Sequence, residues 1–313
     1  MNAIEQGIGL TIVEWVQQTG GDFLWFLLYP LHLLVSEISI LILLPLVYWC
    51  IHKEAGKRLF ILVMATNTIN AFFKGLWQRP RPFTIAPERI KPIAHHASYG
   101  LPSGHTMLGS SVGVWAAAWV RKKWFTLLMA IFIVLMGVSR MVHGVHYPQD
   151  VLLGWILGLL LGWIFIRYEH SVARKIRELG LRQQVIISII ITAVVFLIAV
   201  FVLEDFESKK KVIASVATLG GGLIGIAGES ETVGFNSAGV FYKRILRGIV
   251  GLTILAGFYV LLRAGYYSVA NNAETIWSLA LYLIRYAILG CLTAWGIPYI
   301  FVKTGLAEQY SYK

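Results

Sequence analysis

The chain has 313 residues, of which 57% are hydrophobic and 14% are charged, and its mean hydropathy is +0.69. In soluble domains about a quarter of the residues are charged, so this composition excludes an ordinary soluble protein and indicates a polytopic membrane protein. The formal net charge of +11 is spread over short segments between apolar runs, which is typical of membrane orientation and disfavours a nucleic-acid partner. Cys50 and Cys291 lie in or beside apolar runs without Cys/His spacing, so we expect neither a disulfide framework nor a zinc site.

The first 57 residues predict one helix at the membrane surface and one span. Residues 4–19 place apolar side chains at helical spacing and end at a pair of glycines, a pattern that favours an interfacial amphipathic helix. The apolar run that follows is interrupted by a proline and by Glu37. We therefore expect the first span at about residues 32–51.

Further apolar runs predict an all-α fold, a polytopic transmembrane helical bundle. They cover about residues 59–73, 106–120, 124–138, 151–166, 185–203, 212–227, 248–262 and 276–302. Three basic residues separate the runs 106–120 and 124–138, so these two helices should form an antiparallel hairpin. The earlier runs have about 15 apolar residues, fewer than the roughly 20 that cross a bilayer. We therefore expect their ends to lie at the depth of the lipid headgroups.

Residues 204–313 look like a separate addition to the bundle. Gly220, Gly222 and Gly225 satisfy the pattern GxGxxG, but no strand–helix–strand context surrounds them. Close helix packing is therefore favoured over nucleotide binding. Arg285 lies in the middle of the last apolar run, so it should face the bundle interior and needs an acidic or carbonyl partner.

Residues suited to binding an anion recur at three places that the predicted topology brings to one membrane face. They are Lys74 and Arg81; Ser103, Gly104 and His105; and Arg140, His146 and Asp150. Ser103 directly precedes an apolar run and is a natural helix N-cap, and such a helix start attracts anions. His146 and Asp150 are four residues apart, so the carboxylate can accept the imidazole N–H and leave a lone pair on the other nitrogen. Taken singly, each feature also fits an interfacial or structural role.

The joint pattern reads Lys-x6-Arg-Pro, Pro-Ser-Gly-His and Ser-Arg-x5-His-x3-Asp in that order. Over about residues 58–166 it resembles the type 2 phosphatidic acid phosphatase superfamily, the metal-independent lipid phosphatases that share an active site with vanadium haloperoxidases. The resemblance implies a type 2 phosphatidic acid phosphatase core at residues 58–170, between residues 1–57 and additional C-terminal membrane helices at 171–313. It also implies that the reaction needs no cofactor and no metal.

The resemblance implies a role for each matched residue. His146 would attack phosphorus to form a phosphohistidine, Asp150 would orient His146, and His105 would protonate the leaving group and later activate water. The phosphate oxygens would be bound by Lys74, Arg81, Ser103, Gly104 and Arg140. His143 and the pair His95-His96 match no motif position, and we interpret them as local polar residues.

The expected function is that of an integral membrane lipid phosphatase whose partners are its lipid phosphate substrate and membrane lipids. Undecaprenyl diphosphate and phosphatidyl phosphates, such as phosphatidic acid and phosphatidylglycerophosphate, are the expected substrates, and the oligomeric state stays open. A lipid phosphotransferase would use the same residues and also stays open. A transporter pathway lined by Glu37, Arg285 and the histidines is disfavoured by the ordered motifs and by the lack of a visible inverted repeat. Haloperoxidase activity is disfavoured because the site lies among membrane spans.

The loop charges predict the orientation. Basic residues cluster at 52–58, 121–123 and 167–182, which the positive-inside rule assigns to the cytoplasm. The three motif segments then lie on the opposite face. We expect a bacterial inner membrane protein with its active site facing the periplasm or the outside.

Overall fold

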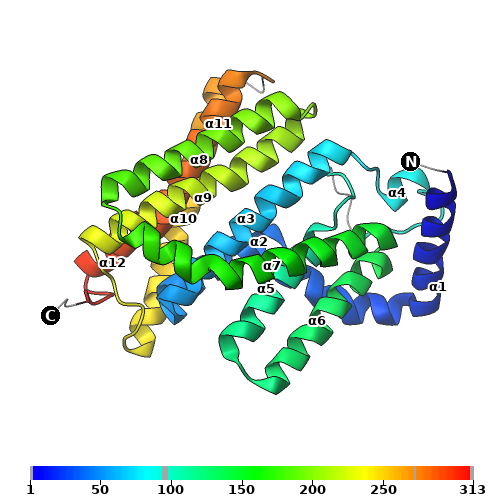
Figure 1. The fold of residues 1–313 in the computed structure, drawn as a ribbon, viewed down its shortest axis with the longest axis horizontal. Coiled ribbons are helices and arrows are strands. Elements are labelled where there is room, and N and C mark those ends of the chain that lie inside the picture. The colour runs from blue at the N-terminus through cyan, green and yellow to red at the C-terminus, as the bar shows by residue number, and fades with distance from the viewer. Residues whose placement is uncertain (1–2, 94–97, 271–272, 311–313) are drawn as a thin grey trace. The chain divides into compact units, whose positions relative to one another are not determined.

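The computed structural model describes residues 3–93, 98–270 and 273–310, so His95 and His96 lie outside the described part of the chain. Within it the named elements are all helices, accompanied by an isolated bridge between Phe235 and Gln309, and the predicted all-α class is confirmed. The chain divides into two compact units, Met1–Ile40 with Ile69–His170, and Leu41–Thr68 with Ser171–Lys313 (Figure 1). The division at residues 57 and 170 into functional domains stays a prediction.

The N-terminal segment is helical on both sides of a glycine break. α1 (Ala3–Leu34) is interrupted at Gly21, whose φ of 50° and ψ of −162° are not helical, and a second helical stretch follows. The predicted helix end at the glycine pair is confirmed, and glycine suits this position because it tolerates positive φ. α2 (Glu37–Leu46) and the π-helical turn η1 (Val47–Ile51) follow at an angle of 51°. The predicted start of a span near residue 32 is therefore wrong, since the new helix begins at Glu37.

Seven helices of the described ranges are long and apolar enough to cross a membrane, or eight spans if the bent pair of α1 and α2–η1 counts as one. The single helices are α3 (Lys53–Trp77) with the short α4 (Pro82–Ile85), α6 (Lys123–Val142), α7 (Pro148–Arg177), α8 (Leu181–Val202), α9 (Phe206–Thr232), α10 (Phe241–Ala270), and α11 (Ile276–Cys291) continued by η2 (Leu292–Gly296) and α12 (Ile297–Lys303). The chain is an integral membrane protein with multiple helical spans.

The helices that bear the motifs are mostly not short. α3, α6 and α7 have 25, 20 and 30 residues, whereas α5 (Gly104–Val120) has 17. The expectation of spans of about 15 residues is wrong for the first three. The backbone hydrogen bonds of a helix continue past the last apolar residue, so a helix outlasts the apolar run that reveals it.

α5 and α6 form the predicted antiparallel hairpin (Figure 1). The connection is Arg121, in left-handed conformation with a φ of 55°, and Lys122, which is the N-cap of α6. Ser103 is the N-cap of α5, as expected, but its side chain makes no capping hydrogen bond. Its Oγ instead accepts a hydrogen bond from Thr106 Oγ1 at 2.9 Å. The helix start is therefore built from backbone geometry rather than from a side-chain cap.

In the second unit, glycines allow α9 to pack closely against α8 and α11 (Figure 1). A Cβ atom at Gly221 would lie 1.9 Å from Ala287 O, and one at Gly220 would lie 2.0 Å from Thr192 Oγ1. At Gly225 it would lie 2.9 Å from Cys291 O. The interpretation of the glycine pattern as a packing feature is confirmed.

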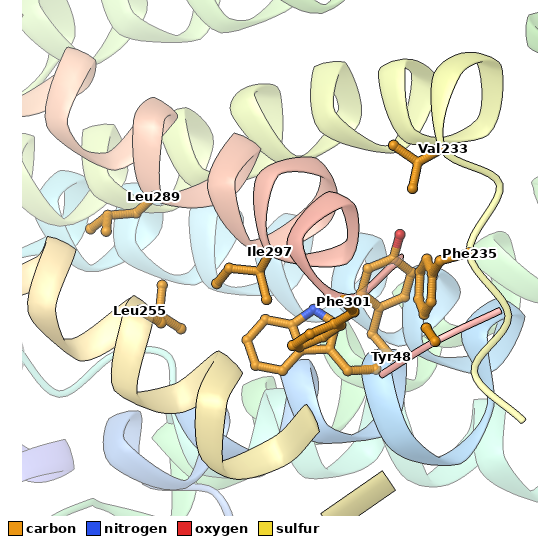
Figure 2. Packing of buried hydrophobic residues seen from close by; sticks show 9 residues of the cluster. Tyr48, Val233, Phe235, Leu255, Leu289, Ile297 and Phe301 are labelled. Carbon is orange, nitrogen blue, oxygen red and sulfur yellow. The ribbon is translucent and has the colours of Figure 1, made fainter. Parts of the chain in front are cut away.

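The core of the second unit is aromatic at one end. Figure 2 shows Tyr48 beside Phe235, with Phe301 and Ile297 nearby. The rings of Tyr48 and Phe235 meet edge to face with centroids 5.1 Å apart, a favourable geometry for aromatic pairs. This cluster joins η1, α12 and the segment after α9.

Arg285 is buried, as expected, but its neighbours are not those expected. Its guanidinium lies over the rings of Tyr259 and Tyr286, at 4.9 and 5.0 Å from their centroids. The prediction of an acidic or carbonyl partner is wrong within the described residues. Aromatic faces stabilise a cation through their electron-rich π systems, an alternative that spacing alone does not indicate.

Candidate active site

The third motif forms a compact unit at the start of α7. Because the helix begins at Pro148, His146 lies just before it and Asp150 lies in its first turn. His146 Nδ1 is 3.3 Å from Asp150 Oδ2, and the Tyr147 backbone N–H donates to the same oxygen at 3.0 Å. Both side chains are buried. Asp150 therefore fixes the orientation of the imidazole.

Asp150 also has a cationic partner that the motif analysis missed. Arg79 Nη1 donates to Asp150 Oδ1 at 3.0 Å, and the Arg79 guanidinium lies 4.6 Å from the centroid of the Tyr147 ring. Arg79 matches no motif position, although the run Arg-Pro-Arg-Pro that ends at Pro82 was a sequence signal for it. Arg79 and His146 thus bind the two oxygens of one carboxylate.

The cations of the first motif border His146. Arg81 donates to Ser98 O at 2.6 Å and to Val145 O at 2.9 Å, and its Nη1 is 3.2 Å from His146 Nε2. A guanidinium can only donate, so we assign His146 Nε2 as the acceptor and place the ring proton on Nδ1, toward Asp150. Lys74 Nζ donates to Tyr99 O at 2.6 Å. The lone pair of His146 therefore points toward Arg81.

Burial lowers the pKa of His146 well below its ordinary value of 6.5. The positive charges of Arg81, Lys74 and Arg140, and then His105, act in the same direction. At neutral pH the ring is therefore uncharged and keeps its lone pair. The cations of the first and third motifs therefore act on one imidazole.

Arg140 is fully buried, and each of its nitrogens has a partner. Nε donates to Ser139 Oγ, Nη1 to His32 Nδ1 and Nη2 to His143 Nδ1, each at 3.1 Å. His143 Nε2 in turn donates to Trp25 O at 3.2 Å. The interpretation of His143 as a local polar residue is therefore wrong, because the side chain is fully buried against a motif arginine.

The electrostatics of His143 match this role as an acceptor. Burial, followed by the charge of Arg140, lowers the pKa of His143 to about 4. The neutral ring can therefore accept the Arg140 N–H at Nδ1 while Nε2 donates to the Trp25 carbonyl. His143 thus fixes the guanidinium without cancelling its charge.

The start of α5 completes the site. Ser103 N–H donates to Asp150 O at 3.0 Å, which joins the start of α5 to the start of α7. The His105 ring is stacked on the His32 ring, with centroids 5.1 Å apart and an interplanar angle of 17°. Gly104 is tightly packed, since a Cβ atom there would lie 2.9 Å from Asn70 Oδ1.

The site as a whole carries excess positive charge. The site contains one buried carboxylate, that of Asp150, and four buried cations, which are Lys74, Arg79, Arg81 and Arg140. A buried cluster of this kind favours a ligand of multiple negative charge, such as a phosphate dianion. In the described part of the chain, no three His, Cys, Asp or Glu side chains are placed to hold a metal ion.

Comparison with known proteins shows which family the chain matches. Residues 55–174 match the family described as the PAP2 superfamily, and residues 213–309 match the family described as PAP2 superfamily phosphatase, transmembrane extension. Phosphatidylglycerophosphatase B of Bacillus subtilis is 31% identical over 132 residues, which cover 39% of this chain and 62% of that protein. Undecaprenyl-diphosphatase of Sulfolobus acidocaldarius is 28% identical over 119 residues, covering 38% and 57%. The chain thus spans about three fifths of the length of these relatives.

Among solved structures, the crystal structure of a transmembrane PAP2 type phosphatidylglycerolphosphate phosphatase from Bacillus subtilis is similar, with a TM-score of 0.47 and 24% identity. The match covers 55% of this chain and 89% of that one. All eight predicted site residues lie within residues 55–174, the first matched range. The chain belongs to the PAP2 superfamily of membrane phosphatases and carries the transmembrane extension of that superfamily.

Proposed function

We propose that this protein is a lipid phosphate phosphatase that works through a phosphohistidine at His146. The observation that carries the proposal is the state of this ring: it is buried and neutral, its Nδ1 is bound to Asp150, and its Nε2 lone pair faces Arg81 at 3.2 Å. An oriented neutral imidazole among fixed cations is suited to attack a phosphorus atom.

The reaction proceeds in two displacements. His146 Nε2 attacks phosphorus, the bond from phosphorus to the leaving oxygen breaks, and His105 gives that oxygen a proton. Water then loses a proton to His105 and attacks the phosphohistidine, which releases inorganic phosphate and restores the neutral imidazole. His105 therefore acts first as an acid and then as a base, a contribution typically worth roughly 10²–10⁴-fold.

The donors around His146 can also balance the negative charge of the phosphoryl group. When substrate enters, the Arg81 N–H that faces His146 Nε2 donates its hydrogen bond to a phosphate oxygen instead, which leaves the Nε2 lone pair exposed. Lys74 and Arg140 bind the remaining oxygens, together with Ser103 and the backbone N–H of Gly104 at the start of α5. Preorganised donors of this kind stabilise the transition state because they need no reorientation during the reaction.

The substrate we propose is a lipid phosphate or diphosphate, with undecaprenyl diphosphate and phosphatidyl phosphates as the first choices. The site residues lie at the ends of apolar helices, where the phosphate of a membrane lipid can meet them without leaving the bilayer. Relatives from two organisms bear the names of enzymes for a phosphatidylglycerol phosphate and for undecaprenyl diphosphate.

The decisive experiment measures phosphate release by the purified protein from a panel of lipid phosphates and diphosphates, with EDTA present throughout. We expect release from at least one class, inhibition by vanadate, which adopts five-coordinate geometry at the same cations, and no effect of EDTA. Adding an alcohol acceptor would reveal a phosphotransferase, since the phosphate would appear on the alcohol. Loss of activity on chelation that magnesium or zinc restores would contradict the mechanism.

We further propose that the protein lies in a bacterial inner membrane with its site open to the outside. The basic turn between α5 and α6 is exposed and would be cytoplasmic by the positive-inside rule. Single cysteines at Glu88 and Lys122, both exposed, test this in a variant that lacks Cys50 and Cys291. A membrane-impermeant thiol reagent on intact cells should label position 88 and not position 122, and the opposite result would invert the topology.

A further inference from the structure

α1 brings a histidine to the site from outside both ranges that match the family. His32 Nδ1 accepts a hydrogen bond from Arg140 Nη1 at 3.1 Å, and its ring lies parallel to that of His105 with centroids 5.1 Å apart. His32 therefore touches one residue of the second motif and one of the third. The family match begins only at residue 55, so no motif includes this contact.

The hydrogen bonds of Arg140 indicate what His32 does. A guanidinium has five N–H groups, and one on each nitrogen is bound, by Ser139, His32 and His143 respectively. These contacts leave one N–H on Nη1 and one on Nη2 for the oxygen atoms of a phosphate group. His32 and His143 thus each accept a hydrogen bond from one of the two terminal nitrogens.

Both acceptors are neutral nitrogen atoms rather than carboxylates. Because Arg140 donates to His32 Nδ1, the proton of that ring lies on Nε2. A carboxylate in the same place would hold the guanidinium equally well but would cancel the charge that a phosphate needs. A neutral imidazole fixes the geometry and preserves the charge.

We propose that His32 is a positioning residue of the active site, which fixes the Arg140 guanidinium for phosphate binding and supports the His105 ring by stacking. The proposal rests on the function proposed above for the same site. It assigns to α1 a part in phosphate recognition that acts through Arg140.

Two substitutions separate the acceptor from the ring. His32→Asn places an amide oxygen near the position of Nδ1 and keeps the acceptor without the ring, whereas His32→Phe keeps a flat ring without an acceptor. His170→Phe is the matched control, since the His170 side chain on α7 is 70% exposed. Each purified variant is titrated with orthovanadate by the shift of its thermal unfolding midpoint, and kcat/KM is measured on the best lipid phosphate.

We expect His32→Phe to weaken vanadate binding and to lower kcat/KM by roughly 10- to 100-fold, the range for losing a hydrogen bond to a charged group. His32→Asn should stay within a few-fold of the wild type in vanadate binding, and the control should be unchanged. Rescue by asparagine separates positioning from a merely structural role, because a structural role for the ring would be kept by phenylalanine and lost with asparagine.

Wild-type vanadate affinity in His32→Phe, or equal losses in His32→Phe and His32→Asn, would overturn the proposal. A wild-type protein that binds vanadate but releases phosphate from no lipid would contradict the proposed function alone. The ranking of the two variants in vanadate binding would still decide the role of His32 in that case.

Discussion

Each of the two compact units buries charged side chains, and the two clusters differ in what the charges contact. In the unit that holds α9 to α12, Lys53 Nζ lies 2.7 Å from Glu229 Oε1 and also donates to Phe235 O at 2.9 Å. Arg247 donates to the carbonyl oxygens of Trp49, Asn236 and Ala238. In the unit that holds α5 to α7, the buried cations Lys74, Arg81 and Arg140 donate to neutral acceptors, and only Arg79 among the four pairs with the carboxylate of Asp150.

We propose that this difference separates a structural cluster from a functional one. Lys53 and Glu229 neutralise each other, and Arg247 donates to carbonyl groups in η1 and in the segment after α9. The cations around His146 are fixed by neutral acceptors and repel one another, so their charge remains available to an anionic ligand. The balance of charge, rather than the number of buried charges, is therefore the feature from which we propose the reaction site.

Of the changes in the site, His146→Ala should have the largest effect on activity. Removing the nucleophile should lower kcat by at least about 10⁴-fold, while far-UV circular dichroism and the thermal unfolding midpoint stay close to those of the wild type. Initial rates on the best lipid phosphate measure the loss. Retention of a tenth of the activity would show that another group attacks phosphorus.

The second prediction contrasts one cation from each cluster. Lys53→Met leaves Glu229 buried without its partner and should destabilise the fold by about 3–5 kcal/mol, with kcat/KM unchanged for the protein that remains folded. Arg81→Gln should do the reverse, since it relieves repulsion between cations: activity falls while the unfolding midpoint stays constant or rises. Thermal unfolding and initial rates of both variants provide the comparison.

The double variant Lys53→Met with Glu229→Leu is the control for this contrast. Replacing a buried ion pair by apolar side chains is often neutral, so most of the lost stability should return. If Arg81→Gln destabilised the protein as much as Lys53→Met, the distinction between the two clusters would be invalid.

Arg79→Gln should have a smaller effect on catalysis. The change removes the positive charge that contacts Asp150 Oδ1 but leaves the contact of Oδ2 with His146. The carboxylate is then held less firmly, and so is the imidazole that it orients. We expect kcat to fall by roughly 10- to 100-fold with little change in KM. A steady-state analysis separates the two constants, and a rise in KM with kcat unchanged would instead place Arg79 among the groups that bind substrate.

The sequence predicted the local parts of the site and missed the distant ones. The N-cap at Ser103 and the contact of His146 with Asp150 depend on residues close together in the chain, whose spacing a helix translates directly into geometry. His32 lies 108 residues before Arg140, and no spacing rule relates the two. Its place depends on the kink at Gly21 and on how α1 packs against α6, both of which are properties of the folded chain.

The fold, too, was predicted only in part. Apolar runs revealed the helices because each span must be apolar. They did not reveal the helix ends, because polar residues there continue the backbone hydrogen bonds of the helix. The hairpin of α5 and α6 followed from three basic residues between two apolar runs. The tyrosine rings around Arg285 come from two helices, and only their packing shows that aromatic faces replace a carboxylate.

The smallest expected effect concerns pH and the neutral histidines of the site. In the folded protein the pKa of His143 is about 4, whereas an ordinary imidazole has a pKa of 6.5, so between these values the unfolded chain binds a proton that the folded chain does not. The unfolded state is then favoured as the pH falls. The contribution of His143 to the free energy of unfolding should therefore be fully present above about pH 6.5 and decline toward pH 4. His146, whose pKa is also lowered, acts in the same direction.

His143→Asn keeps an acceptor for Arg140 but cannot be protonated, so its unfolding midpoint should fall less between pH 7.5 and pH 5 than that of the wild type. Thermal unfolding in detergent at a series of pH values measures the slopes. His170→Asn, at an exposed position, should retain the wild-type slope. Equal slopes of unfolding midpoint against pH in His143→Asn and the wild type would show that folding does not lower the pKa of His143. The neutral acceptor that distinguishes this cluster from the ion pair of the second unit would then be ruled out.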